Sequence, residues 1–270
     1  MMTIDEKIQR LKQNLAGMQS VLVAFSGGVD STFLLKMAFD QLGDKVLAVT
    51  ATSATYPRKE LLEAQEFCLS LGAKHMIIPV DQLQVPDFAN NPYDRCYLCK
   101  RHLFEHLREL SCSLDIKAVA DGSNLDDRQD FRPGMQAIKE LGIATPLLDA
   151  GLNKGEIRQL SQEMGLPTWN KPASACLASR FPFGEPISSA RLSMIEQAED
   201  YLRDYGFKQV RVRVHGDLAR IEVGIEERNL MVSLENMDKV SKYLKELGFA
   251  FVTMDLNGYQ SGCFNPQTGI

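Results

Sequence analysis

The sequence has no long hydrophobic run, no signal segment and no excess of basic residues. Its apolar runs, such as residues 46–49, fall far short of the roughly 20 residues that a membrane-spanning helix needs. Residues 1–7 carry charged side chains and no apolar segment, which predicts a cytoplasmic protein. The net charge of −5 argues against a large nucleic-acid-binding surface. We therefore expect a small-molecule partner, and neither a membrane nor a nucleic acid.

Internal repeats and low-complexity stretches are also absent. The composition is that of an ordinary globular protein, with 44% hydrophobic and 24% charged residues among 270. A chain of this length can bury a core without disulfides, and it suits one large domain or two smaller ones. Because no export signal is present, the six cysteines are not expected to form a disulfide framework.

Strand and helix patterns alternate along the first part of the chain. Buried-strand patterns cover residues 21–25, 45–52, 75–80 and 117–124, and helical patterns cover 3–18, 31–37, 58–71, 97–110 and 153–164. This alternation predicts an α/β fold, a parallel sheet with helices on both faces. Ligands of such sheets bind beyond the carboxyl ends of the strands. We therefore expect Ser26, Thr52 and residues 121–124 to line one pocket.

The pattern changes after residue 172. Residues 209–215 alternate strictly between apolar and polar side chains, and residues 219–223 follow a short turn, which predicts an antiparallel hairpin. Helical patterns at 190–205 and 240–247 and a last strand at 250–255 complete this part. We predict a first domain of residues 1–172 and a smaller C-terminal α+β domain of residues 173–270.

The most informative segment runs from Val21 to Thr32 and reads as strand, glycine turn and helix. Gly27 and Gly28 can adopt backbone angles closed to other residues, so consecutive N–H groups can point into one concavity. The following helix adds unpaired N–H groups and the positive end of its dipole. Further hydroxyl donors are Ser26, Ser31 and Thr32, and Asp30 supplies a carboxylate for Mg²⁺. The segment predicts a phosphate or pyrophosphate site.

A Gly-Gly pair alone is often only a connection, and this loop lacks both the lysine of the Gly-x-x-x-x-Gly-Lys-Ser/Thr loop and the Gly-x-Gly-x-x-Gly spacing. The whole string Ser26-Gly-Gly-Val-Asp-Ser31 resembles the pyrophosphate loop (PP-loop) of the ATP pyrophosphatase superfamily. Members of this superfamily cleave ATP between the α and β phosphates, attach AMP to a substrate oxygen, and let a nucleophile displace the AMP. The resemblance implies ATP binding, with Thr52 and Gly122 among the contacts.

Three cysteines have a spacing of interest. Cys96 and Cys99 open a predicted helix, whose N-terminus lowers thiol pKa values, and two thiols at this spacing form half of a metal site. They could equally be a redox pair or two buried thiols. Cys176 lies in a loop rich in small residues, and together with the pair it could hold a [4Fe–4S] cluster with one iron left open. Cys68 and Cys112 lie on predicted helices and are expected to be core thiols.

Motifs spread over nearly the whole chain resemble one family within this superfamily. Besides the loop, they are Asp121-Gly122, Asp130-Phe-Arg-Pro-Gly134, Ser179-Arg-Phe-Pro-Phe-Gly184, Arg211-Val-Arg-Val-His215 and Asp255-Leu-Asn-Gly-Tyr-Gln-Ser-Gly262. The family is the LarE-type ATP-dependent sulfur-insertion enzymes of lactate racemase cofactor assembly. Its members adenylate a carboxylate of a pyridinium dicarboxylate mononucleotide and convert it into a thiocarboxylate, a step towards a nickel-pincer nucleotide.

The resemblance implies further properties. One subgroup gives up the sulfur of its own cysteine in a single turnover, and the other holds a [4Fe–4S] cluster on three cysteines and turns over repeatedly. Cys176 fits either subgroup, whereas the pair Cys96 and Cys99 favours the cluster. The family also implies a homo-oligomer built from trimers, up to a hexamer, other enzymes of nickel-pincer cofactor assembly as partners, and a second domain that takes part in substrate binding and oligomerisation.

Arginines are the remaining candidates. Arg211 and Arg213 share one face of a strand and suit a substrate phosphate or carboxylate, with a solvated strand face as the alternative. Arg180 could reach the α-phosphate of ATP, or form a surface ion pair instead. Asp121, Asn124 and Arg132 are further pocket candidates, and Glu222 is expected to be a solvated strand charge.

Three other functions compete with sulfur insertion. A tRNA thiolase would use the same loop and a similar cluster, and would bind tRNA with a steep salt dependence. An amide-forming relative, of the NAD or GMP synthetase type, would not need Cys96, Cys99 and Cys176 together. A nucleotide sensor would bind ATP without releasing pyrophosphate.

Overall fold

The computed structural model describes residues 2–128, 133–172, 175–260 and 263–264. The chain divides into two compact units, the first made of Met1–Gln82 and Asp94–Ser174, and the second of Leu83–Tyr93 and Ala175–Ile270. The sequence analysis places residues 83–93 in the first domain. In the structure they pack with the second unit, because the N–H groups of Gly184 and Ile187 donate to the carbonyls of Asn91 and Ala89.

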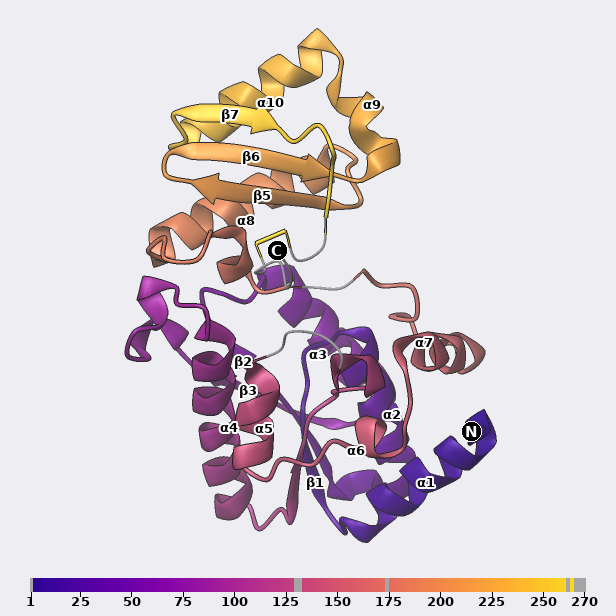
Figure 1. The fold of residues 1–270 in the computed structure, drawn as a ribbon. Coiled ribbons are helices and arrows are strands. Elements are labelled where there is room, and N and C mark those ends of the chain that lie inside the picture. The colour runs from indigo at the N-terminus through magenta and orange to yellow at the C-terminus, as the bar shows by residue number, and fades with distance from the viewer. Residues whose placement is uncertain (1, 129–132, 173–174, 261–262, 265–270) are drawn as a thin grey trace, which may run out of the picture. The chain divides into compact units, whose positions relative to one another are not determined.

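The first unit contains a parallel sheet of strands in the order β3-β2-β1-β4. The strands are β1 (Val21–Ala24), β2 (Val46–Thr52), β3 (Lys74–Pro79) and β4 (Ala118–Ala120). The helices are α1 (Ile4–Gly17), α2 (Val29–Leu42), α3 (Arg58–Leu71), α4 (Arg95–Ser113), α5 (Gly134–Glu140), α6 (Pro146–Asp149) and α7 (Lys154–Glu163). Figure 1 shows these elements around the sheet. The predicted α/β fold is confirmed.

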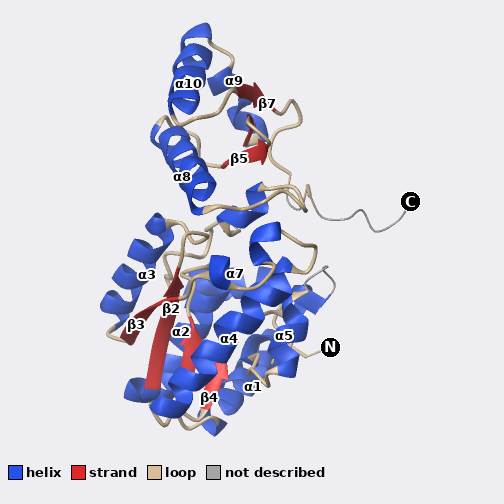
Figure 2. Cartoon of the chain, turned by 90° about the vertical axis from the view of Figure 1, so that its left-hand side faces the viewer, coloured by secondary structure: helices blue, strands red, loops and turns tan. Residues whose placement is uncertain are grey.

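Helices cover both faces of this sheet (Figure 2), because the strands are apolar on both sides. Val21 and Val23 pack with side chains of α1, α2, α3, α6 and α7. Leu22, which points to the opposite face, packs with α4 and α5. Cys68 is buried in the first of these cores, as predicted, and burial raises the pKa of its thiol to about 12. The same prediction for Cys112 is wrong, because it lies exposed on α4.

The second unit is a smaller α+β unit with a sheet in the order β5-β6-β7. Its elements are α8 (Ser189–Asp204), β5 (Val210–His215), β6 (Leu218–Val223), α9 (Arg228–Met231), α10 (Leu234–Glu246) and β7 (Phe251–Met254). The predicted hairpin is the antiparallel pair β5–β6, and β7 adds to β6 in parallel. Helices α8 and α10 lie side by side, with the rings of Tyr201 and Tyr243 stacked at 4.0 Å. In the described residues, no helix is long and apolar enough to span a membrane.

Candidate functional site

The glycine turn lies at the carboxyl end of β1, as predicted. Strand pairing continues one residue past β1, where the N–H of Phe25 donates to Val49, and α2 begins directly after Gly28. Gly27 has φ +63°, and a Cβ atom there would lie 3.3 Å from the Cβ of Ala64 on α3. A side chain at this position would therefore strain the backbone and press on α3.

Hydroxyl groups hold the turn closed. The Oγ of Ser31 accepts the N–H of Ser26 at 3.3 Å and donates to the carbonyl of Gly28 at 3.2 Å. The Oγ atoms of Ser26 and Ser31 lie 3.1 Å apart. Thr32 is fully buried, and its Oγ1 has no hydrogen-bond partner among the described residues. A buried hydroxyl without a partner at the start of α2 fits a loop that binds a polar ligand.

Asp30 has the properties of a cation ligand. Its Oδ2 forms an ion pair with Lys154 Nζ at 2.5 Å. Its Oδ1 is buried and has no well-formed hydrogen bond in the described part of the chain, although the Asn124 side chain is close enough to lower the pKa of the carboxyl group. Burial raises the pKa of Asp30, and the charge of Lys154 opposes this shift. Mg²⁺ prefers carboxylate oxygens, so the free oxygen of Asp30 fits the ion predicted from the sequence.

Two further strand ends adjoin this turn. A Cβ on Gly122 would lie 3.1 Å from the backbone N of Ser31, so the segment after β4 touches the start of α2. The neighbouring residue Asp121 forms an ion pair with Lys100, with Nζ and Oδ2 3.2 Å apart. Lys100 is not among the residues predicted from the sequence. Thr52 ends β2, the strand next to β1. The structure therefore groups Ser26, Gly27, Gly28, Asp30, Ser31, Thr32 and Gly122 at the carboxyl edge of the sheet, with Thr52 at the end of the adjacent strand.

The cysteines of the predicted cluster belong to different units. Cys96 is exposed on the first turn of α4, and Cys99 is half-buried at the start of the second turn. Cys176 is exposed and precedes the short 3₁₀ helix η5 (Leu177–Arg180) of the second unit. Within the residues described, no three His, Cys, Asp or Glu side chains are grouped to hold a metal ion. The donor chemistry of the three thiols fits a cluster, and their assignment as its ligands stays a prediction.

Arg180 lies inside the second unit, where it is only 1% exposed. Its Nε and Nη2 atoms donate to the two carboxylate oxygens of Glu199, at 2.8 and 2.9 Å. Its Nη1 donates to the carbonyls of Ala175 and Cys176, at 2.8 and 3.1 Å. The predicted surface ion pair is thus a buried one that fixes the Cys176 loop. The predicted contact between Arg180 and the α-phosphate stays a prediction.

The two strand arginines are buried, so the alternative of a solvated strand face is wrong. Arg213 pairs with Glu222 on β6 at 2.9 Å and also donates to the carbonyl of Ser179 at 3.0 Å. The guanidinium of Arg211 lies 5.3 Å from the ring of Tyr259. Burial lowers the pKa of Arg211, and the charge of Arg180 acts in the same direction. Glu222 is 1% exposed, which contradicts the expectation of a solvated charge.

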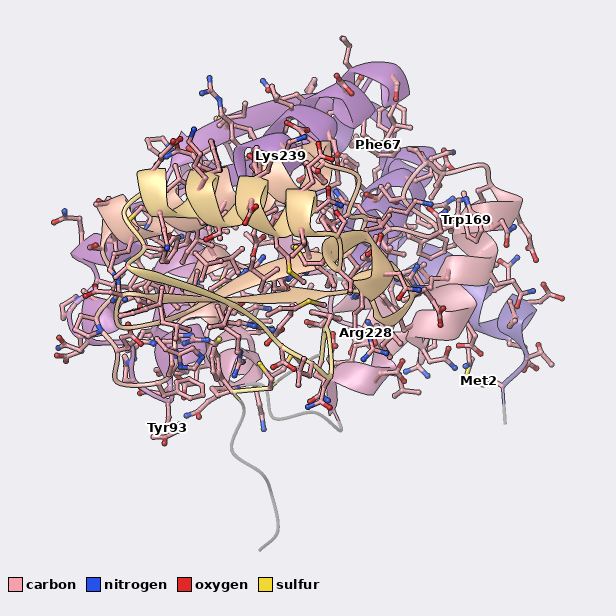
Figure 3. The ribbon with its side chains drawn as sticks, turned by 90° about the horizontal axis from the view of Figure 1, so that it is seen from above. Met2, Phe67, Tyr93, Trp169, Arg228 and Lys239 are labelled. Carbon is pink, nitrogen blue, oxygen red and sulfur yellow. The ribbon has the colours of Figure 1, made fainter. Side chains whose placement is uncertain are left out.

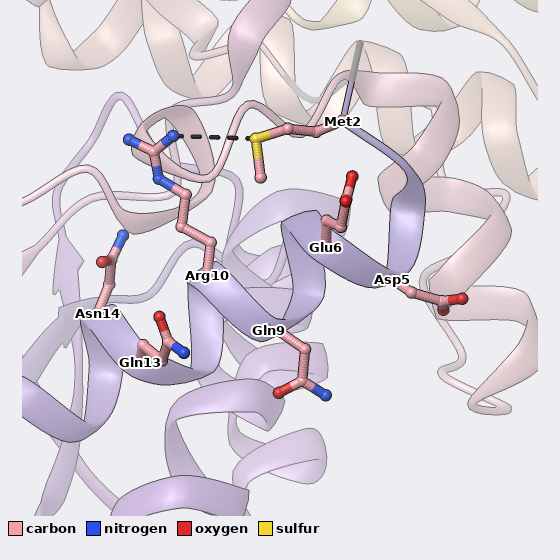
Figure 4. A pocket seen from close by; sticks show the side chains of 7 residues that line it. All are labelled: Met2, Asp5, Glu6, Gln9, Arg10, Gln13 and Asn14. Atoms are coloured by element: carbon pink, nitrogen blue, oxygen red, sulfur yellow. Dashed lines mark hydrogen bonds between the residues drawn. The ribbon is translucent and has the colours of Figure 1, made fainter.

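Asp130 and Arg132, which the sequence analysis singled out, lie outside the described residues. A hollow on the surface of α1 (Figure 4) is lined by Met2, Asp5, Glu6, Gln9, Arg10, Gln13 and Asn14. None of these is a predicted site residue, and the contact between Arg10 and the sulfur of Met2 has no evident catalytic use.

Comparison with known proteins identifies relatives of the whole chain. Residues 3–91, which contain the turn, match the NAD synthase family. An uncharacterised protein of Synechocystis sp. is 42% identical over 97% of this chain and 98% of its own length. An uncharacterised protein of Methanocaldococcus jannaschii is 30% identical over 96% of this chain and its full length.

A third relative has a defined product. The pyridinium-3,5-bisthiocarboxylic acid mononucleotide synthase of Lactiplantibacillus plantarum is 40% identical over 98% of this chain and 96% of its own length. The match covers the nucleotide loop, the Cys176 loop and the arginine strand together. This chain therefore belongs to the LarE-type family of ATP-dependent sulfur-inserting enzymes, within the PP-loop ATP pyrophosphatase superfamily.

Proposed function

We propose that this enzyme uses ATP to activate a carboxylate of a pyridinium dicarboxylate mononucleotide and converts it into a thiocarboxylate. The observation that carries the proposal is the loop at the end of β1, beside which one oxygen of Asp30 and the hydroxyl of Thr32 have no hydrogen-bond partner among the described residues. The product named for the Lactiplantibacillus plantarum relative supports the choice of substrate. The expected partner is this small nucleotide, and no nucleic acid or membrane.

The loop serves the activating half of the reaction. A carboxylate is a poor electrophile because its oxygen would leave as oxide. Attack of that oxygen on the α-phosphorus breaks the bond to the β-phosphate, releases diphosphate, and leaves AMP as the leaving group. The N–H groups of the turn and the Ser26 and Ser31 hydroxyls stabilise charge on the departing diphosphate. Asp30 would hold Mg²⁺, which neutralises the same charge.

The second half of the reaction replaces AMP by sulfur. A sulfide donor attacks the carbonyl carbon of the acyl adenylate, its S–H proton is lost to solvent, and AMP leaves. We propose that Cys96, Cys99 and Cys176 hold a [4Fe–4S] cluster, which when bound would present this sulfide. Arg180 fixes the Cys176 loop through two backbone carbonyls, and Arg211 and Arg213 would bind a phosphate or carboxylate of the substrate.

The cluster is tested by anaerobic purification and reconstitution, followed by iron and sulfide analysis and a visible spectrum. Cys96→Ala, Cys99→Ala and Cys176→Ala are each expected to lose iron and visible absorption. Cys112→Ala is the matched control, because Cys112 is an exposed thiol on the same helix as the pair, and it should keep both signals. A colourless, iron-free wild-type protein after reconstitution would falsify the cluster.

Turnover separates the remaining functions. Diphosphate release and a thiocarboxylate product are expected with ATP, Mg²⁺ and the mononucleotide substrate, and their absence would leave a nucleotide sensor. Mass spectrometry of the protein after turnover tests the alternative of a sacrificial cysteine. Loss of the mass of hydrogen sulfide at Cys176 would favour that alternative over the cluster. Tight tRNA binding with a steep salt dependence would favour a tRNA thiolase instead.

A further inference from the structure

Two side chains outside the loop bind its carbonyl groups. The hydroxyl of Tyr56 donates to the carbonyl of Ser26 at 2.7 Å. The ammonium group of Lys171 donates to the carbonyl of Gly27 at 3.1 Å. The sequence motif contains neither residue, since Tyr56 follows β2 and Lys171 follows α7.

These two contacts determine where the loop N–H groups point. In a trans peptide unit the C=O of one residue and the N–H of the next point in opposite directions. Holding the carbonyl of Ser26 therefore directs the N–H of Gly27 away from Tyr56. Holding the carbonyl of Gly27 directs the N–H of Gly28 away from Lys171 in the same manner.

This control matters because the loop contains two consecutive glycines. Glycine has no Cβ and populates positive and negative φ about equally, so neither peptide has a strong intrinsic orientation. A flipped peptide would present a carbonyl oxygen, which repels phosphate, where an N–H donor is needed. Two external donors on two successive carbonyls would suppress that flip.

Lys171 is itself held in place. Its Nζ contacts Glu60 at 2.5 Å and Glu63 at 2.7 Å, both on α3, the helix that packs against Gly27. These carboxylates raise the pKa of Lys171 in spite of its burial, which acts in the opposite direction. The backbone around Lys171 is fixed by Arg158, which donates to the carbonyls of Lys171 and of Trp169 (labelled in Figure 3), both at 2.7 Å.

Tyr56 is kept in its donor form. Burial raises the pKa of its phenol, and the negative charges of Glu60 and Glu63 add to the shift. A phenol that stays protonated over the whole physiological range can always donate to Ser26. Glu60 and Glu63 thus hold the cation at Gly27 and keep the neutral donor at Ser26 protonated.

We propose that Tyr56 and Lys171 are positioning residues of the pyrophosphate loop, which orient the Gly27 and Gly28 N–H groups for diphosphate without touching it. The proposal rests on the proposed use of ATP at this loop. It adds a function for α3, which becomes the support of the loop through Ala64, Glu60 and Glu63.

The test measures binding of magnesium diphosphate by calorimetry, together with the melting temperature. Tyr56→Phe and Lys171→Met are each expected to weaken binding about three- to tenfold, the usual size of one lost hydrogen bond. Tyr56→Phe should do so at little cost in melting temperature, whereas Lys171→Met also removes the cation that Glu60 and Glu63 contact and should lower the melting temperature. Matched controls are Tyr93→Phe, at an exposed tyrosine, and Lys74→Met, whose ammonium donates to the carbonyl of Asp44. Both controls should bind like the wild type.

Conservative rescue adds a second readout. Lys171→Arg keeps a charged donor between Gly27 and the two carboxylates, and it should recover most of the binding that Lys171→Met loses. In turnover, Tyr56→Phe should raise KM for ATP more than it lowers kcat. If Lys171→Met does not fold, the binding of magnesium diphosphate by Tyr56→Phe, which keeps the aromatic ring, tests the proposal by itself.

The outcomes distinguish this proposal from the proposed function. Wild-type protein that binds neither diphosphate nor ATP contradicts the proposed function itself. Wild-type protein that binds, with Tyr56→Phe and Lys171→Met binding equally well, contradicts only the positioning role. Weaker binding by Tyr56→Phe together with a clearly lower melting temperature would make its contact with Ser26 merely structural, and would also overturn the proposal.

Discussion

Asp30 shows how the burial of one carboxylate reduces the stability of the fold at neutral pH. Its carboxylate is largely buried, with one oxygen paired to Lys154 and the other unpartnered in the described part of the chain. The net effect raises its pKa, so the folded state holds the proton more tightly than the unfolded state. The contribution of Asp30 to the free energy of unfolding is therefore most favourable below the ordinary pKa of an aspartate. This contribution is lost as the pH rises through the higher pKa of the folded state.

We expect Asp30→Asn to be at least as stable as the wild type at pH 7, since the ionised, buried carboxylate is gone. The same variant should lose about 100-fold or more in ATP-dependent activity, because a metal ligand can supply several kcal/mol to the transition state. Urea unfolding at pH 7 and pH 4 checks the first expectation, and Mg²⁺-dependent diphosphate release checks the second. A variant that is clearly less stable at pH 7 would mean that the Lys154 ion pair outweighs burial.

Residues of the loop could be predicted from the sequence because their relation is local. Ser26 and Ser31 are five positions apart, and the two glycines between them predict the turn. Lys171 could not be predicted, because it reaches Gly27 across 144 positions and has no motif of its own. The same holds for Glu199, whose carboxylate on α8 contacts Arg180 on η5 across 19 positions and belongs to no motif.

At the scale of elements, the charged face of β5 is buried and not solvated. The alternation of β5 predicts a strand with one apolar face, and Val210, Val212 and Val214 are indeed buried. The opposite face is buried as well, because each arginine there meets a carboxylate, an aromatic ring or a backbone carbonyl. Periodicity indicates which side chains share a face, but it does not reveal what covers that face. The structure also corrects one helix boundary. Helix α10 begins at Leu234 and not at the predicted residue 240, and Ser233 is its N-cap.

Helix α8 carries the most consequential of these carboxylates. Glu199 is fully buried, and the nearby charges of Arg180, Arg211 and Arg203 lower its pKa against the effect of burial. We expect Glu199→Gln to cost about 3–5 kcal/mol of unfolding free energy, because it leaves the buried Arg180 uncompensated. Urea unfolding measures this loss. Asp200→Asn, next to it on α8, is the control, because its half-exposed ion pair with Arg203 should contribute less than about 1 kcal/mol.

A smaller loss for Glu199→Gln, equal to that of Asp200→Asn, would contradict a structural role for this pair. The loss should also reach the Cys176 loop, since Arg180 holds the carbonyls of Ala175 and Cys176. Faster alkylation of Cys176 in the Glu199→Gln variant would report that loosening.

At the scale of the molecule, the match to the named synthase extends over both units. The match to the NAD synthase family ends at residue 91, whereas the full-length relatives continue through the arginine strand and the C-terminal helices. A nucleotide-binding unit alone specifies activation by ATP. Sulfur insertion is indicated by the match of the whole chain to the bisthiocarboxylic acid mononucleotide synthase.

The second unit exposes several large apolar side chains close together near the start of α10. Among the described residues, Leu230, Val232 and Leu234 are 47%, 61% and 80% exposed around the start of α10. We propose that they lie in the contact of a homo-oligomer, since burying one such side chain gains about 1.5–3 kcal/mol. Val232→Asp combined with Leu234→Asp should then give a smaller particle in light scattering, with an unchanged circular dichroism spectrum.

Leu69→Asp, at an equally exposed leucine on α3 of the first unit, should leave the particle size unchanged. A wild-type protein that is monomeric at micromolar concentration would contradict the oligomer, and an oligomer that survives the double substitution would place its contact elsewhere.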